Sequence, residues 1–463
     1  MLSEVRRRAR SSTRSAIAVL AATVVLVGTV SCTPDDPDGV PGPDGVSSPA
    51  PSPTPGGEVT VGVLGALATL DPYSPLASDL TRQLVRPIYP SLFRLVPGDE
   101  GLILPEPYLA ETLEPARGGV RITLASMRWS TGRPIVARDV VASVRRAIAP
   151  SGLARVSKAI AVAPDVVVLK GNIRDWQSTL ATLAFVLPSG RARPEVGGGP
   201  FYMRRYVPGL EIVYEKNPGW PGEGPYVDSA TVQFVQGIDL MFGLARAGRL
   251  DVMVPPSAVN LSDRLDAIGF EHSSDVGYEV LYLDLGGAPW TDAQAARIAA
   301  SLNVRAMKTG LIRADGRRAD HLSAAPGAPS ARRLWSARGR AKTDDEIQIA
   351  GPIGDELIEL IQKVSQVHLT KHEYAAELVS IDPEIYYGEW TRDDPMDIAV
   401  RRLVGGPGLR FPASIFRTVE AVPLFFVASY IAWNPAVLGP RANPTHDGPL
   451  WNMEQWFRGD QGD

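Results

Sequence analysis

The feature that most constrains the fold is a long alternation of strand and helix patterns that begins at Gly57. About 400 residues follow this glycine, more than one hydrophobic core usually supports, so we expect two lobes. Strand patterns recur at residues 58–63, 120–125, 166–169, 212–214, 231–235, 280–285, 347–350 and 376–380. Helical patterns lie between them at residues 137–149, 239–247, 292–302 and 355–367. This alternation predicts an α/β fold with mixed sheets and flanking helices.

The only cysteine, Cys32, follows a pattern typical of an export signal. Five arginines precede an apolar run at residues 16–30, and the small Ser31 stands directly before the cysteine. The sequence Thr29-Val30-Ser31-Cys32 resembles a bacterial lipobox, with Thr29 in place of the commoner leucine. We therefore predict a signal peptide at residues 1–31 and a diacylglycerol group on the Cys32 thiol. An uncleaved anchor is the alternative, although the run is shorter than the ~20 residues of a membrane-spanning helix.

Residues 32–56 connect this signal to the folded part of the chain. Eight prolines and four aspartates stand among almost no apolar residues. Such a segment cannot bury enough surface to offset the entropy of ordering it, so we predict a disordered tether.

The whole chain carries a charge of −4 and residues 1–31 carry +4, which leaves about −8 for the mature protein. This acidic balance argues against a nucleic-acid partner.

A collinear set of short motifs occupies the region after Gly57. The set comprises residues 69–72 (TLDP), 104–111, 129–134 (WSTGRP), 137–140 (ARDV), 198–202 (GGPFY), 208–209 (PG), 217–220 (NPGW), 224–228 (GPYVD), 248–251 (GRLD) and 289–290 (PW). Together they resemble the family 5 extracellular solute-binding proteins, which are the oligopeptide-, dipeptide- and nickel-binding components of ABC importers. The resemblance covers residues 57–457 in order.

The resemblance implies a two-lobed, type II periplasmic-binding-protein-like fold with a hinge. Lobe 1 would comprise residues 57–270 and 425–463, and lobe 2 residues 275–420. The expected partners are a small-molecule or peptide ligand, ABC permease subunits and, through Cys32, the extracytoplasmic face of the cell membrane. We expect a monomer that has no cofactor, no metal and no catalytic residues.

The ligand site is less constrained, because two registers are open for the acidic residue with which peptide-binding members hold the ligand's amino terminus. One register places Asp393 at this position. The other, which we favour because it keeps strand and helix lengths, places Gly406 there and leaves the anchor missing. The strand before it then carries Arg401 and Arg402 and ends in Gly405 and Gly406.

Strand alternation puts Arg401 and Arg402 on opposite faces, so we expect at most one to point into the cleft. An inward arginine would favour an anionic ligand. The alternative is that both are solvated or pair with Asp393, Asp394 or Asp397.

Aromatic side chains near the lobe crossings are further candidates for the cleft: Phe201, Tyr202, Tyr282 and Trp290. Packing within the core is the alternative for each of them.

An enzymatic reading finds little support in the sequence. His368 and His372 are four residues apart with Glu373 adjacent, but the H-E-x-x-H arrangement and a third ligand are missing. The sequence therefore predicts a lipid-anchored protein that captures a small peptide-like or anionic ligand for an ABC importer. The alternative is a transport-inactive family member that acts as an envelope scaffold or regulator and binds a protein or lipid partner.

Overall fold

Strand β1 (Glu58–Leu64) shows how the local pattern builds the fold. Val59, Val61 and Val63 alternate along it and are buried, as expected for side chains that share one face of a strand. The strand pairs in parallel with β10 (Ser229–Val235) on one side and β11 (Val252–Val254) on the other. It therefore lies inside a sheet, and its C-terminal end meets the loops of both neighbours.

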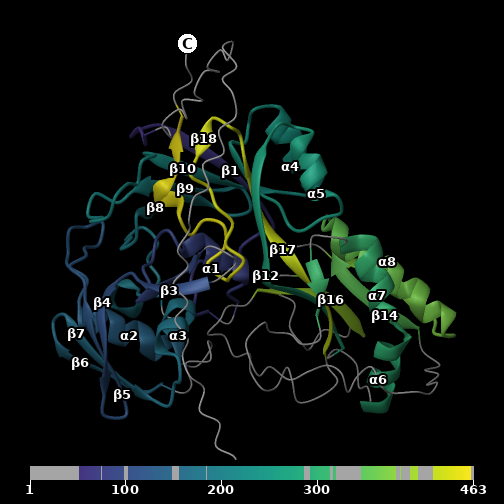
Figure 1. The fold of residues 1–463 in the computed structure, drawn as a ribbon, viewed down its shortest axis with the longest axis horizontal. Coiled ribbons are helices and arrows are strands. Elements are labelled where there is room, and N and C mark those ends of the chain that lie inside the picture. The colour runs from purple at the N-terminus through teal and green to yellow at the C-terminus, as the bar shows by residue number, and fades with distance from the viewer. Residues whose placement is uncertain are drawn as a thin grey trace, which may run out of the picture. The chain divides into compact units, whose positions relative to one another are not determined.

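The computed structural model (Figure 1) describes residues 52–74, 76–98, 103–148, 156–183, 185–285, 292–312, 316–319, 346–381, 386, 397–404 and 421–459. These residues all fall within one compact unit that spans residues 51–463. The predicted signal peptide, Cys32 and most of the predicted tether lie outside the described residues.

The largest sheet of the described residues has 11 strands and mixes parallel with antiparallel pairs. Its order is β15 (Ala376–Ile381), β14 (Ile347–Pro352), β16 (Ile398–Val404), β12 (Glu271–Asp284), β17 (Ala421–Trp433), β11, β1, β10, β9 (Glu211–Lys216) and β8 (Phe201–Val207), and β13 (Gly316–Arg318) also pairs with β17. The long strands β12 and β17 thus join the strands around β1 to those around β14 (Figure 1).

A second, four-stranded antiparallel sheet has the order β4 (Ala110–Ala116), β5 (Gly119–Leu124), β7 (Val166–Gly171) and β6 (Val156–Ala163). Helix α2 (Ala137–Ala147) packs on β6 and β7 of this sheet. Two small hairpin-like sheets complete the strands: β2 (Phe93–Pro97) with β3 (Ile103–Pro107), and β18 (Val437–Leu438) with β19 (Phe457–Arg458). The other helices are α1 (Asp79–Val85), α3 (Trp176–Leu183), α4 (Ile238–Arg246), α5 (Leu261–Asp266), α6 (Asp292–Ser301), α7 (Val304–Met307) and α8 (Glu356–Lys371).

The buried apolar side chains form separate clusters that follow the sheets. The largest cluster combines residues between 59 and 252 with residues between 431 and 456. A second cluster uses residues between 281 and 427 and includes the buried face of α8. A third lies under α4 and α5. The lobe boundaries given above remain a prediction.

Asp139 explains why one of the sequence motifs has its form. The carboxylate is buried and accepts hydrogen bonds from Trp129 Nε1 at 3.3 Å, Val136 N at 3.2 Å and Ser189 N at 2.8 Å. Arg133 adds an ion pair at 3.1 Å. The motif therefore caps the N-terminus of α2, where a negative charge is favoured, and its residues serve the fold.

The glycines at 198 and 199 are required by close packing. Neither glycine has a φ in the left-handed region, so backbone angles do not require them. A Cβ on Gly199 would lie 2.5 Å from the carbonyl oxygen of Pro87, and one on Gly198 would meet the ring of Trp129 at 2.8 Å. Gly199 lets two backbone segments touch, and Gly198 leaves room for the Trp129 side chain.

The predicted α/β class is confirmed, and each predicted strand and helix overlaps an observed one. Helix α8 extends four residues beyond its predicted end. Strand β17 is the main element that the patterns missed. Its 13 residues are buried along nearly their whole length, so they show no alternation of apolar and polar side chains.

Candidate ligand-binding site

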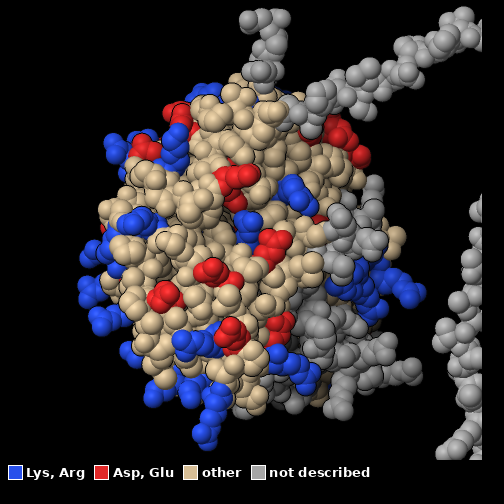
Figure 2. Space-filling model, turned by 60° about the vertical axis from the view of Figure 1, so that its left-hand side comes forward, with Lys and Arg blue, Asp and Glu red and all other residues tan. Residues whose placement is uncertain are grey.

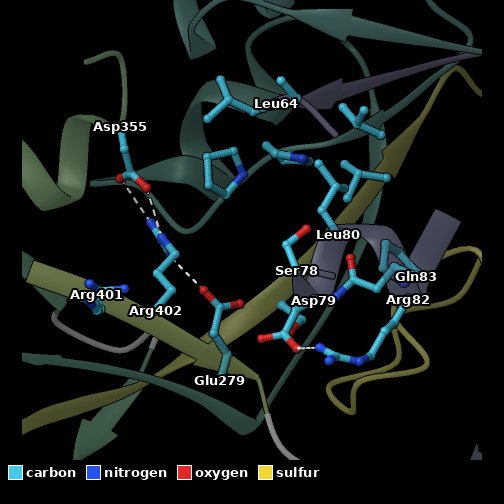
Figure 3. Close-up of a pocket in the computed structure, with 18 of the residues that line it drawn as sticks. Leu64, Ser78, Asp79, Leu80, Arg82, Gln83, Glu279, Asp355, Arg401 and Arg402 are labelled. Carbon is cyan, nitrogen blue, oxygen red and sulfur yellow. Dashed lines mark hydrogen bonds and ion pairs between the residues drawn. The ribbon is translucent and has the colours of Figure 1, made fainter. Parts of the chain in front are cut away.

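A cavity of about 430 Å³ lies where several strand ends and helix starts converge. One side is formed by the end of β1, the start of α1 and the loop after β11; the other side is formed by β12, β16 and the start of α8. Figure 3 shows these elements around the cavity. We call it the β1/β16 cavity. Its size lies within the range of small-molecule sites, about 300–1,000 Å³.

Helix α1 presents polar groups to the β1/β16 cavity. Ser78 caps the helix by accepting a hydrogen bond from Thr81 N at 3.1 Å, which places the next residue, Asp79, at the positive end of the helix. Asp79 forms an ion pair with Arg82 at 3.1 Å, and both side chains are about one quarter exposed. Figure 3 shows the carboxylate of Asp79 on the side of the cavity that faces Glu279.

Arg402 makes hydrogen bonds with three other residues at the wall of the cavity. Its Nε and Nη2 atoms contact the two carboxylate oxygens of Asp355 at 2.8 and 3.0 Å, and its Nη1 atom contacts Glu279 at 2.5 Å. Nη2 also donates to the carbonyl oxygen of Ser257 at 3.1 Å. Such a bidentate arrangement is geometrically specific, and Figure 3 shows Arg402 between the two carboxylates.

Asp355 has two roles because of its position. It is the N-cap of α8, where its carboxylate accepts a hydrogen bond from Ile358 N at 3.1 Å. The side chain is only 2% exposed, so it needs the positive charge that Arg402 supplies. The start of α8 and the strand β16 are therefore locked together at the wall of the cavity.

Glu279 is an acid on β12 whose side chain is 13% exposed, and it lies next to an irregularity in the pairing of that strand with β17. Burial raises the pKa of its carboxyl, the Arg402 guanidinium opposes this rise, and the charges of Asp355 and Asp79 add to it. The repulsion from Asp79 links the two walls of the cavity electrostatically. A cation placed between these two acids would relieve that repulsion.

Arg401 lies on the other face of β16, as alternation predicts. It forms an ion pair with Asp284 at 3.1 Å, and its guanidinium lies 5.9 Å from the centre of the Tyr386 ring. Arg401 and Tyr386 both line the β1/β16 cavity. Both arginines thus line this cavity, although we expected at most one of them to point into the cleft.

The structure brings three of the predicted site residues together at the β1/β16 cavity: Tyr282, Arg401 and Arg402. Phe201 does not reach it, because its side chain is fully buried in the largest apolar cluster. Tyr202 lies on the edge strand β8 and donates a short hydrogen bond to Glu215. Trp290, Gly405 and Gly406 lie outside the described residues, as does Asp393, so the structure leaves both registers of the acidic anchor open.

Among the described residues, Arg401 pairs with Asp284, and Arg402 pairs with Asp355 and Glu279. Asp397 accepts a hydrogen bond from Gln348 N at 2.9 Å, and Asp394 lies outside the described residues. The acids Asp79, Glu279 and Asp355 were not singled out in the sequence. Asp79 and Asp355 could have been found as capping residues at helix starts, whereas Glu279 stands in a polar strand segment that gives no such signal.

The described residues provide no metal centre, since none of their His, Cys, Asp and Glu side chains gather in groups of three or more that could hold an ion. His368 accepts a hydrogen bond from Asn303 N at 3.2 Å, and His372 stands at the C-terminal end of α8. Within the same residues, no helix is both long and apolar enough to cross a membrane.

Comparison with protein families identifies this architecture. Residues 105–329 match the family described as bacterial extracellular solute-binding proteins, family 5, middle part. Over these residues the chain is similar to the family 5 solute-binding proteins. Members of this family bind solutes and do not transform them, in agreement with the absence of catalytic motifs from the sequence. No curated protein matches the chain.

Solved structures show which fold the chain has. It is similar to the periplasmic EDTA-binding protein EppA, with 15% identity, 88% of this chain and 98% of that chain covered, and a TM-score of 0.72. The oligopeptide-binding protein AppA from Bacillus subtilis, bound to a nonapeptide, gives 15% identity, coverages of 88% and 100% and a TM-score of 0.71. NikZ from Campylobacter jejuni, bound to Ni(L-His), gives 13% identity, coverages of 87% and 99% and a TM-score of 0.71. The predicted type II periplasmic-binding-protein-like fold is therefore confirmed.

Proposed function

We propose that this protein captures a small solute in the β1/β16 cavity outside the cytoplasm and delivers it to an ABC importer. The family match supports solute binding, and the cavity supplies a place for it. Binding would select a closed form in which the elements on both sides of the cavity contact the ligand, and the permease subunits would recognise that form.

The charged side chains that line the cavity favour one class of ligand over another. Its described lining holds three carboxylates, Asp79, Glu279 and Asp355, and three guanidinium groups, Arg82, Arg401 and Arg402. A purely anionic ligand would have to compete with the carboxylates that already contact these arginines. A zwitterion meets the same competition at its carboxylate, but its ammonium group can lie between Asp79 and Glu279, whose negative charges repel each other. This pattern favours a peptide-like solute over an anionic one.

We also propose that the protein acts at the outer face of the cell membrane, held by a lipid on Cys32 through the tether of residues 32–56. The sequence pattern before Cys32 supports this anchoring. Figure 2 shows acidic and basic side chains interspersed over one face of the molecule, so that face offers no broad patch of a single charge. Attachment through the lipid would not need one.

A thermal-shift screen of the detergent-purified full chain tests the proposal. Amino acids and dipeptides are compared with matched compounds that lack the amine or lack the carboxylate. We expect stabilisation, as for any ligand that binds only the folded state, by zwitterions and little by either single-charge series. Stabilisation by the carboxylate-only series would reverse the choice of ligand. A complete lack of response across the screen would favour the scaffold or regulatory role.

A further inference from the structure

A second cavity, of about 780 Å³, shares no lining residue with the β1/β16 cavity. Its wall combines Arg94 of β2, the segment at Tyr108 after β3, the loop at Trp220 and residues around Glu454. Pro53, near the start of the described chain, also lines it. Neither the proposed transport function nor the family motifs assign a role to this cavity.

Aromatic rings form one side of the second cavity. The rings of Tyr108 and Trp220 lie with their centres 5.6 Å apart at an angle of 43°. The guanidinium of Arg94 lies 5.4 Å from the centre of the Tyr108 ring, and Tyr226 contributes a third aromatic side chain to the lining. Flat apolar faces of this kind pack well against other rings.

Two buried N–H donors of this cavity have no acceptor. Nε1 of Trp220 and Nε of Arg94 are both inaccessible to solvent and make no hydrogen bond with any described residue. Buried donors without acceptors are unfavourable. A ligand that brings oxygen acceptors to this wall would satisfy them once the two side chains turn their donors toward the cavity, so the cavity is suited to a ligand rich in acceptors.

The charges of the cavity are balanced, which argues for a neutral ligand. Arg94 pairs with Glu454 at 3.0 Å, and burial raises the pKa of the Glu454 carboxyl despite this pairing. Arg441 and Glu223 supply one further charge of each sign to the lining. An ionic ligand would have to disrupt this balance.

The chain itself shows that a proline fits at the rim. Pro53 lines the cavity, and a few residues later Gly56 N donates a hydrogen bond to Tyr226 O at 2.7 Å. Prolines stand at every second position from 49 to 55 in this part of the sequence. A proline-rich strand has no internal hydrogen bonds, so its carbonyl oxygens remain available as acceptors.

We propose that the second cavity binds an extended, proline-rich peptide segment of a partner protein. The proline rings would pack on Tyr108 and Trp220, and peptide carbonyl oxygens would accept hydrogen bonds from Trp220 Nε1 and Arg94 Nε. Aromatic grooves recognise polyproline segments in this way, because such segments lose little entropy on binding. The site would link this solute-binding protein to a second protein without involving the transported solute.

Fluorescence anisotropy with a labelled peptide tests the proposal on the detergent-purified full chain. The probe is Ser-Pro-Ala-Pro-Ser-Pro-Thr-Pro, the sequence of residues 48–55, and a peptide with alanine at each proline is its control. We expect saturable binding of the probe only. Trp220→Phe keeps an aromatic ring, although a smaller one, and removes the N–H donor, and we expect it to weaken binding about tenfold.

The matched control is Trp433→Phe, because Trp433 Nε1 donates to Glu271 at 3.0 Å and does not line the cavity; we expect its affinity to stay unchanged. Lack of probe binding to the wild type, or equal binding by both tryptophan variants, would overturn the proposal. If a neutral oligosaccharide displaces the probe, and the alanine control peptide binds as well as the probe does, the cavity is a sugar site instead. Should Trp220→Phe not fold, protection of residues 217–226 from hydrogen exchange when the probe is added to the wild type decides the question.

Discussion

At the scale of single residues, Arg402 connects three groups from different elements at the wall of the β1/β16 cavity. Asp355, Glu279 and the carbonyl of Ser257 all contact its guanidinium. A buried ion cluster of this kind contributes little net stability, since desolvation offsets the attraction, but removal of one partner leaves the others without compensation. The cluster therefore fixes the position of charged groups at the cavity wall.

Replacing Arg402 by methionine should lower the free energy of unfolding by roughly 3–5 kcal/mol, because two buried carboxylates lose their counter-charge. Urea denaturation measures this loss. The control is Arg204→Met, whose arginine is 67% exposed and 4.0 Å from Glu215, and it should change the free energy by less than about 0.5 kcal/mol. Equal effects of the two substitutions would show that Arg402 is not held as described.

The acid Glu279 gives a prediction for pH dependence. Its pKa is raised above the ordinary value of 4.5, mainly by burial, so the folded state binds the proton more tightly than the unfolded state does. Its contribution to stability is complete below the ordinary value and is lost as the pH rises through the raised pKa.

Wild type should therefore lose stability relative to Glu279→Gln over this pH window, and denaturation of both proteins across the window measures the difference. A constant difference between them would mean that the pKa of Glu279 is not raised.

At the scale of elements, close packing and capping decide where chain segments meet. Asp139 joins α2 to Trp129 and Ser189 through hydrogen bonds. Gly199 lets residues 197–201 approach the backbone at Pro87. Both features lie in motifs that the sequence made visible, yet their contacts join segments that are far apart in the chain.

Two glycine substitutions distinguish the effect of close packing on stability from the effect of glycine's low helix propensity. Gly199→Ala should destabilise the protein by about 1–3 kcal/mol, because the new Cβ would meet backbone atoms of Pro87. Gly243→Ala in α4 has no atom within 4 Å of the new Cβ and should stabilise the protein by about 0.5–1 kcal/mol. Thermal unfolding of both variants gives the two signs, and the same sign for both would contradict the packing argument.

Local patterns predicted many of the elements and few of the site residues, for physical reasons. Periodicity identified β1 and α2 because one face of each is buried and the other is not. It missed β17, which is buried on both faces. Arg401 and Arg402 drew attention as adjacent charges in an apolar strand, but Glu279 and Asp79 become site residues only because the fold brings β12 and α1 to the same cavity.

At the scale of the whole molecule, we expect the protein to act at the outer face of the cell membrane, held by a lipid on Cys32. Mass spectrometry of the mature N-terminus should show a chain that begins at Cys32 and carries a diacylglycerol group. Cys32→Ser should lack this group and lose the membrane attachment that depends on it. An unmodified Cys32 thiol in the mature wild type would remove the anchor from the proposal and leave the solute site untouched.

A calorimetric titration of the best zwitterionic ligand from the screen into wild type and Glu279→Gln tests whether the solute binds in the β1/β16 cavity. We expect the ligand to bind Glu279→Gln at least tenfold more weakly than wild type, because its ammonium group loses a carboxylate partner. Asp228→Asn, which alters an exposed ion pair with Lys216, should bind as wild type does. Equal affinity of wild type and Glu279→Gln would contradict the claim that the solute binds in the β1/β16 cavity.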